Sequence, residues 1–106
     1  METKTIYLKN NVDFKRGQIY SLCLRRARYF EPDESILFCT PSKEHGTEMK
    51  ITSQHQFRFF DLKDGDVRHN YDANIQSIID LQLKMMQSYK DFDDREIVTI
   101  IKFKML

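Results

Sequence analysis

The stretch that most constrains the fold runs from Asp72 to Lys90 and has the periodicity of one two-sided helix. At about 100° per residue, apolar side chains fall on one wide arc and polar side chains fall on the opposite arc. The apolar arc is interrupted only by Gln82 and holds Ile75, Ile78, Ile79, Leu81, Leu83, Met85, Met86 and Tyr89. An arc this wide must lie on a sheet or on a partner. We therefore predict a packed globular domain with Ile78 and Ile79 in its core, and a surplus apolar strip for a partner.

Composition bounds the class of protein. The chain has 106 residues, 41% hydrophobic and 31% charged, which is typical of a folded chain and favours one domain over residues 1–106. No run approaches the roughly 18 apolar residues that cross a membrane, and no apolar secretion signal follows the first residues. Cys23 and Cys39 stand apart in apolar surroundings. We therefore expect free thiols and a cytoplasmic location.

The remaining elements divide into clear strands and one ambiguous segment. Alternation and β-branched residues predict strands over Thr3–Lys9, Ser35–Thr40, Glu48–Thr52, Gln56–Leu62 and Ile97–Phe103. Strict alternation fails over Gln18–Phe30, whereas helical spacing collects most of its polar residues on one arc, so a helix is favoured there. The alternative is a strand over Tyr20–Phe30 that pairs with Ser35–Thr40 across the turn at 31–34.

The resulting order, β-α-β-β(-β)-α-β, predicts a small α+β domain. Its economical form is an antiparallel sheet of four or five strands with two helices on one face, the ferredoxin-like plan. If Gln18–Phe30 is a strand, the fold becomes a β-rich barrel with one C-terminal helix. Neither plan fixes a function, because such folds host enzymes, binding modules and regulators alike.

A local basic cluster is the first candidate site. The net charge is only +1, but residues 1–30 carry seven basic and two acidic side chains. On the expected helix, Arg25 and Arg28 lie on the exposed arc and Arg26 lies near its apolar edge. Arginine offers a planar fork of donors that suits phosphate or carboxylate, so these residues are candidate contacts for a partner or a nucleic acid. The alternative is a solvated face whose arginines pair with nearby acids, namely Glu31, Asp33 or Glu34.

The string Ile6-Tyr7-Leu8-Lys9-Asn10 adds Tyr7 and Lys9 to the candidates. It resembles the first-strand motif of RNA-recognition-motif domains, in which an aromatic side chain stacks on a base. The resemblance covers these residues alone, because Gln56-Phe57-Arg58-Phe59-Phe60 lacks the glycine of that family's third-strand motif. It implies one open sheet face that carries Tyr7, Lys9, Phe57, Phe59 and Lys102. The alternative is that both phenylalanines point inward beneath the helices.

Other chemistry-bearing residues show no catalytic or metal pattern. The three histidines are too far apart for a zinc motif, and the aspartates at 61–66 and 91–94 match no calcium loop and suit turns and helix ends. No serine or cysteine lies in a nucleophile elbow. We expect no cofactor, no metal and no enzymatic activity.

The sequence therefore predicts a small non-enzymatic protein that regulates or inhibits a protein partner by docking. The codon preference implied by its abundant Phe, Tyr, Ile, Asn and Lys suggests a phage-like, A/T-rich source. The main alternative is RNA or other nucleic-acid binding through the basic residues and sheet aromatics. A site for a small molecule or substrate that converges only in three dimensions is a third possibility. The surplus apolar strip also leaves a homo-oligomer open.

Overall fold

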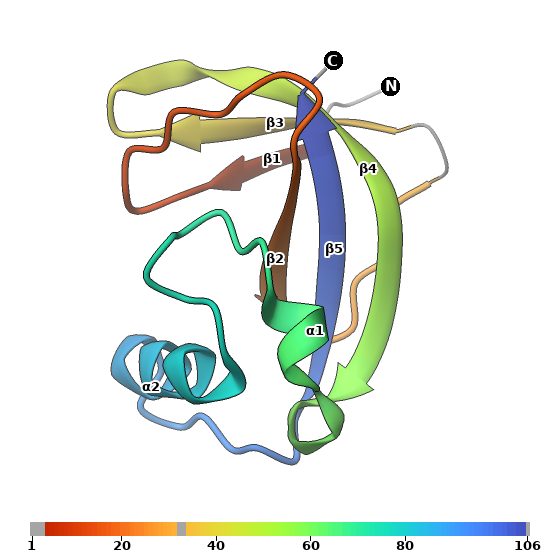
Figure 1. Ribbon diagram of the computed structural model, residues 1–106, viewed down its shortest axis with the longest axis vertical. Coiled ribbons are helices and arrows are strands. Elements are labelled where there is room, and N and C mark those ends of the chain that lie inside the picture. The colour runs from red at the N-terminus through yellow and green to blue at the C-terminus, as the bar shows by residue number, and fades with distance from the viewer. Residues whose placement is uncertain (1–3, 32–33, 106) are drawn as a thin grey trace.

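The computed structural model describes residues 4–31 and 34–105 (Figure 1). The strands are β1 (Lys4–Tyr7), β2 (Ile19–Arg25), β3 (Ser35–Thr40), β4 (Lys43–Arg58) and β5 (Ile97–Met105). The helices are η1 (Phe59–Asp61, a 3-10 helix), α1 (Asp64–Val67) and α2 (Ile78–Ser88). The expected α+β class is confirmed. None of the helices in the described ranges has the length and hydropathy of a membrane-spanning segment.

The strands form one mixed sheet in the order β1-β3-β4-β5-β2. Every neighbouring pair is antiparallel except β1 and β3, which are parallel, so the expectation of an antiparallel sheet is wrong at that edge. Strand β4 is 16 residues long and curves, so that β1 and β3 cross over one end of β2 and β5 (Figure 1). A register shift between Ile51 and Ser53 lies in the bend, as β-bulges commonly do. The sheet stays open, with β1 and β2 as its two edges, and no closed barrel forms.

The segment expected to be a helix over residues 18–30 is the strand β2. It pairs with β5, with Tyr20 opposite Phe103 and Leu22 opposite Ile101, and not with Ser35–Thr40 as the strand alternative had it. The alternation fails because both faces of β2 are covered, so apolar residues occupy both. The ferredoxin-like plan is unconfirmed, since the segment that would supply its first helix is a strand.

The first core lies inside the curl of the sheet. The rings of Phe38 in β3 and Phe103 in β5 stack with centroids 4.2 Å apart, although β4 separates their strands. This contact is possible only because β4 bends. Phe14, from the segment between β1 and β2, packs edge-on against Tyr20 at 5.0 Å. The backbone N–H of Lys15 donates to the Tyr20 hydroxyl at 2.8 Å, which fixes this segment over the core.

The second core lies on the opposite face of β5 and β2, beneath the helices. It joins Val98 and Ile100 of β5 to η1, α1 and α2. Helix α2 is shorter than expected, because the hydroxyl of Ser77 caps it by accepting from the backbone N–H of Asp80 at 3.2 Å. Asp72, where the expected helix begins, instead holds a turn by accepting from the backbone N–H of Asn74 at 2.9 Å. The expected apolar arc of residues 72–90 is therefore real, but it is divided between a short loop and α2.

Candidate functional site

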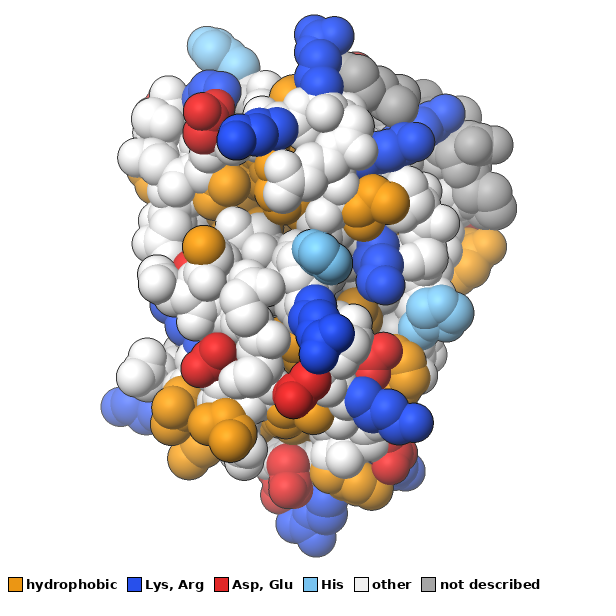
Figure 2. Space-filling model, in the orientation of Figure 1, with side chains coloured by type: hydrophobic (Ala, Val, Ile, Leu, Met, Phe, Trp, Pro, Cys, Tyr) orange, Lys and Arg blue, Asp and Glu red, His pale blue; other side chains and the backbone are white. Residues whose placement is uncertain are grey.

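An apolar strip on α2 is exposed. The side chains of Ile79, Leu83 and Met86 are 71%, 54% and 56% accessible, whereas Leu81 and Met85 on the opposite side of the helix are 4% and 5% accessible. Spacings of four and three residues place the exposed three in one row, hereafter the α2 strip. Figure 2 shows hydrophobic side chains gathered over α2 at the lower left. The predicted surplus strip is confirmed, and the expectation that Ile79 lies in the core is wrong.

Arg25 does not lie on an exposed helix face. Its guanidinium donates to both carboxylate oxygens of Glu96, at 2.8 and 2.6 Å, and approaches Asp91 at 3.1 Å. It also lies 4.7 Å from the ring centroid of Tyr89, the residue that ends α2. The hydrogen bonds from Arg25 lower the pKa of the Glu96 carboxyl, and the same pair raises the pKa of Arg25. Arg25 is therefore a structural residue that holds the C-terminal end of α2 against β2.

Arg26 and Arg28 follow the end of β2, and their side chains are exposed. Thr99 of β5 fixes this turn, because its hydroxyl accepts from the backbone N–H of Arg28 and donates to the carbonyl of Arg26, both at 2.8 Å. Among the ion pairs of the described residues, none joins Arg26 or Arg28 to the acids expected to pair with them. Glu34 lies 3.6 Å from Lys4, and Asp33 falls outside the described residues.

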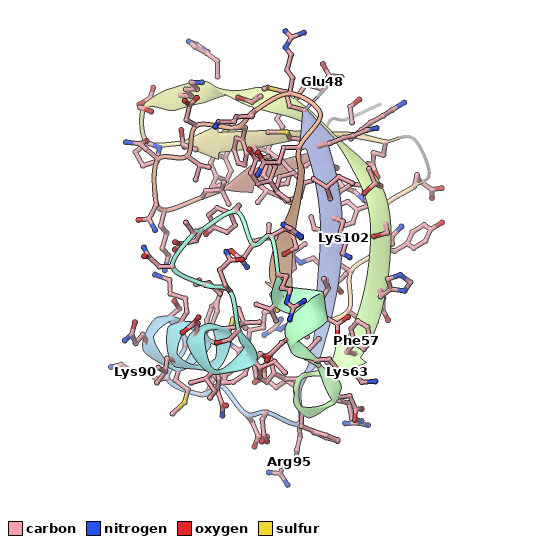
Figure 3. The ribbon with its side chains drawn as sticks, viewed as in Figure 1. Glu48, Phe57, Lys63, Lys90, Arg95 and Lys102 are labelled. Atoms are coloured by element: carbon pink, nitrogen blue, oxygen red, sulfur yellow. The ribbon has the colours of Figure 1, made fainter. Side chains whose placement is uncertain are left out.

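Tyr7 is the last residue of β1, and Lys9 lies just beyond it. Both are exposed and line a cleft beside α2, so the five predicted site residues do not form one surface. The aromatic face implied by the RNA-recognition resemblance is not formed, because Phe59 is buried in η1 against Phe92 with ring centroids 5.0 Å apart. Figure 3 shows Phe57 and Lys102 on neighbouring strands β4 and β5. Phe57 is half-buried.

The cleft beside α2 has a volume of about 160 Å³ and is hereafter the β1–α2 cleft. Its walls come from β1, β2, α2 and the loop that precedes α2. Apolar side chains from both cores meet in it, together with two lysines, Lys9 and Lys84, and the side chain of Asn70. No local pattern in the sequence predicts this convergence, because the lining residues run from Ile6 to Tyr89.

A second hollow, about 570 Å³ in volume, follows the edge of β2 and is basic. Arg68, His69 and Lys102 line it, and we refer to these three as the basic groove. Figure 2 shows Lys, Arg and His side chains close together in the middle of this face. The groove exists because the backbone N–H of Ser21 in β2 donates to the carbonyl of His69 at 2.8 Å. Sequence reasoning missed Arg68 and His69, since no local pattern signals that they adjoin β2.

No three His, Cys, Asp or Glu side chains within the described ranges gather as metal ligands do. Comparisons of the chain with protein families, with curated proteins and with solved structures gave no match. A function must therefore be inferred from the geometry of the α2 strip, the β1–α2 cleft and the basic groove.

Proposed function

We propose that this chain is a small non-enzymatic regulator that docks on a protein partner through the α2 strip and inhibits or otherwise modulates it. The observation that carries the proposal is the exposure of Ile79, Leu83 and Met86 in one row on a helix whose other side is buried. An amphipathic helix of this kind binds by laying spaced apolar anchors into a hydrophobic groove. Burying each such side chain contributes about 1.5–3 kcal/mol, so three anchors can support a specific complex.

The neighbours of the strip define the partner's surface. Gln82 and Gln87 flank the strip on α2, and both are uncharged. The complementary surface is therefore an apolar groove with a neutral polar rim. A flat twofold contact between two copies of α2 would bury only three side chains per copy, well short of the ~800 Å² per partner of a stable interface. A groove that wraps the helix reaches that area, which favours a different protein over a second copy.

The test compares Leu83→Glu with Gln87→Glu, which adds the same charge at an exposed position beside the strip. The tagged protein captures its partner from the source cells, the partner is identified and purified, and calorimetry measures the affinity of each variant. We expect Leu83→Glu to weaken binding about 100-fold or more, as the loss of a central anchor does. Gln87→Glu should stay within about threefold of the unaltered protein.

Two results would contradict the proposal. One is a purified partner that binds Leu83→Glu as tightly as the unaltered chain. The other is a dimer in light scattering that Leu83→Glu dissociates, which would show that the strip serves a second copy. Because Leu83 is exposed, the melting temperature of the variant should not change, and a loss of binding can be separated from unfolding.

Nucleic-acid binding is the second candidate, and the basic groove favours it. None of the described Asp and Glu residues lines the groove, and Lys104 of β5 lies opposite Ile19, a lining residue, in the β2–β5 ladder. Phosphate contacts would make affinity fall steeply with salt. The test is anisotropy of labelled single-stranded RNA over a salt series with Arg68→Glu plus Lys102→Glu. Equal affinity of the variant and the unaltered chain for RNA would rule out this candidate. Leu83→Glu should leave the affinity for RNA unchanged.

A further inference from the structure

The β1–α2 cleft lies where the two edges of the open sheet approach α2. Strands β1 and β2 are the terminal strands of the sheet and do not pair with each other. The wall formed by β1 and β2 is apolar and includes Ile6, Leu22 and Leu24. The wall formed by α2 includes Leu81 and Met85. The cleft therefore offers an apolar interior at a place where neither core is sealed by a neighbouring strand.

The cleft is also lined by the side-chain amide of Asn70, which can donate to a ligand. Asn70 is 7% accessible, and its side-chain oxygen accepts from the backbone N–H of Asp72 at 2.9 Å. That bond fixes the orientation of the amide, because a backbone N–H requires an acceptor. The amide nitrogen of Asn70 then has no hydrogen-bond partner within the described ranges. That nitrogen is not one of the buried side-chain atoms that lack a partner, which in the described ranges is Thr40 Oγ1 alone, so it stays open to solvent and can donate to a ligand.

The charges around the cleft have one sign. Lys9 and Lys84 line it, whereas none of the described Asp and Glu residues does, and neither lysine forms an ion pair with another described residue. Tyr71 adds a phenol on the same lining, and burial raises the pKa of its hydroxyl, so it remains a neutral donor at physiological pH. The polar groups of the cleft are therefore donors and cations. They complement a group that only accepts hydrogen bonds and carries negative charge, which describes a carboxylate.

The volume limits the rest of the ligand. The cleft holds about 160 Å³, close to the roughly 150 Å³ of an apolar cavity that accepts benzene. A phosphate group would press two charges against leucine side chains, whereas a carboxylate can reach the lysines at the mouth while an apolar body fills the interior. We propose that the β1–α2 cleft binds a small organic carboxylate whose apolar body is about the size of a benzene ring.

The test is a titration of the full chain, labelled with ¹⁵N, with sodium benzoate, and with benzamide as a neutral probe of the same shape. We expect saturable shifts at the side-chain amide of Asn70 and along Leu22–Leu24, with a Kd of about 1 mM for a ligand this small. Benzoate should bind at least tenfold more tightly than benzamide. Lys9→Met plus Lys84→Met keeps the aliphatic stems, should keep the fold, and should abolish that preference.

Lys90→Met is the matched control, because Lys90 is exposed beyond the end of α2 and does not line the cleft. It should leave the preference for benzoate intact. Three results would overturn the inference: no saturable shift, equal affinity for benzoate and benzamide, or shifts confined to the basic groove. The inference does not rest on the α2 strip, so Leu83→Glu should bind benzoate as the unaltered chain does.

Discussion

Arg25 and Glu96 form a two-bond ion pair that joins the end of β2 to the residue before β5, with N–O distances of 2.8 and 2.6 Å. Their side chains are 16% and 24% accessible, so the pair is only partly screened by water. The bonds from Arg25 favour the charged form of Glu96 and lower the pKa of its carboxyl. A carboxyl whose pKa is lower in the folded state stabilises the fold at neutral pH, and that contribution is lost as the pH falls.

The first prediction concerns this pH dependence. The free energy of unfolding should decrease as the pH falls from about 4.3, the ordinary pKa of glutamate, through the lowered pKa of Glu96. Glu96→Gln should be less stable than the unaltered chain at pH 7 and should show a flatter decrease toward acid. Urea denaturation at several pH values measures both. The exposed Glu44 supplies the control Glu44→Gln, and a Glu96→Gln profile parallel to the unaltered one would contradict the assignment.

The two sides of α2 give the second prediction. Leu81→Asp places a charge in the second core and should cost about 4 kcal/mol or more of unfolding free energy. Ile79→Asp adds the same charge on the exposed strip and should change stability by about 0.5 kcal/mol or less. Thermal melts and urea titrations compare the two variants directly. If Ile79→Asp unfolds the domain, then Ile79 belongs to the core and the α2 strip is misassigned.

The elements that sequence reasoning found are those with a strong local period. The Ile97–Phe103 run is β-branched and became the buried centre of β5, and the apolar arc of residues 72–90 predicted α2 with its surplus strip. The period of residues 18–30 was misleading, because Leu22 packs in one core while Cys23 packs in the other. A strand that is covered on both faces loses the alternation by which strands are identified. The parallel pairing of β1 with β3 joins segments that are distant in the chain, such as Lys4 opposite Ile36, and no local pattern encodes it.

The candidate sites divide in the same way, into those with a local sequence pattern and those that depend on tertiary structure. A surplus apolar strip was predictable, because the whole arc belongs to one segment, but its members were not, since Ile79 was expected in the core and is exposed. The assignment of Arg25 failed, because its partner Glu96 is 71 residues away and meets it only when β2 pairs with β5. The β1–α2 cleft and the basic groove likewise join segments that are distant in the chain, so they require the tertiary structure.

Three glycines give a graded third prediction. Gly46 has φ of +81°, and a β-carbon there would lie 3.0 Å from the sulfur of Cys39 and 3.3 Å from the β-carbon of Leu37. Gly46→Ala should therefore cost about 2–4 kcal/mol, from backbone strain and crowding together. Gly17 has φ of +77° in open space, so Gly17→Ala should cost only the strain, about 1–2 kcal/mol. Gly65→Ala in α1 meets neither obstacle and should be neutral or slightly stabilising.

Chemical denaturation of the three alanine variants measures this order. Because the changes are identical, differences in the unfolded state are similar and largely cancel. A Gly46→Ala protein as stable as Gly65→Ala would show that β4 does not pass close to Cys39.

The last prediction concerns the thiol of Cys23. Burial raises its pKa to about 12, so very little of the thiol is the reactive thiolate at pH 8. We expect iodoacetamide at pH 8 to leave Cys23 unmodified in the folded protein and to alkylate it readily in urea, as peptide mass mapping can show. The unfolded sample is the internal control, because it has the same thiol without the burial. Rapid alkylation of Cys23 in the folded protein would mean that the edge of β2 opens to solvent, and that the β1–α2 cleft is wider in solution than its 160 Å³.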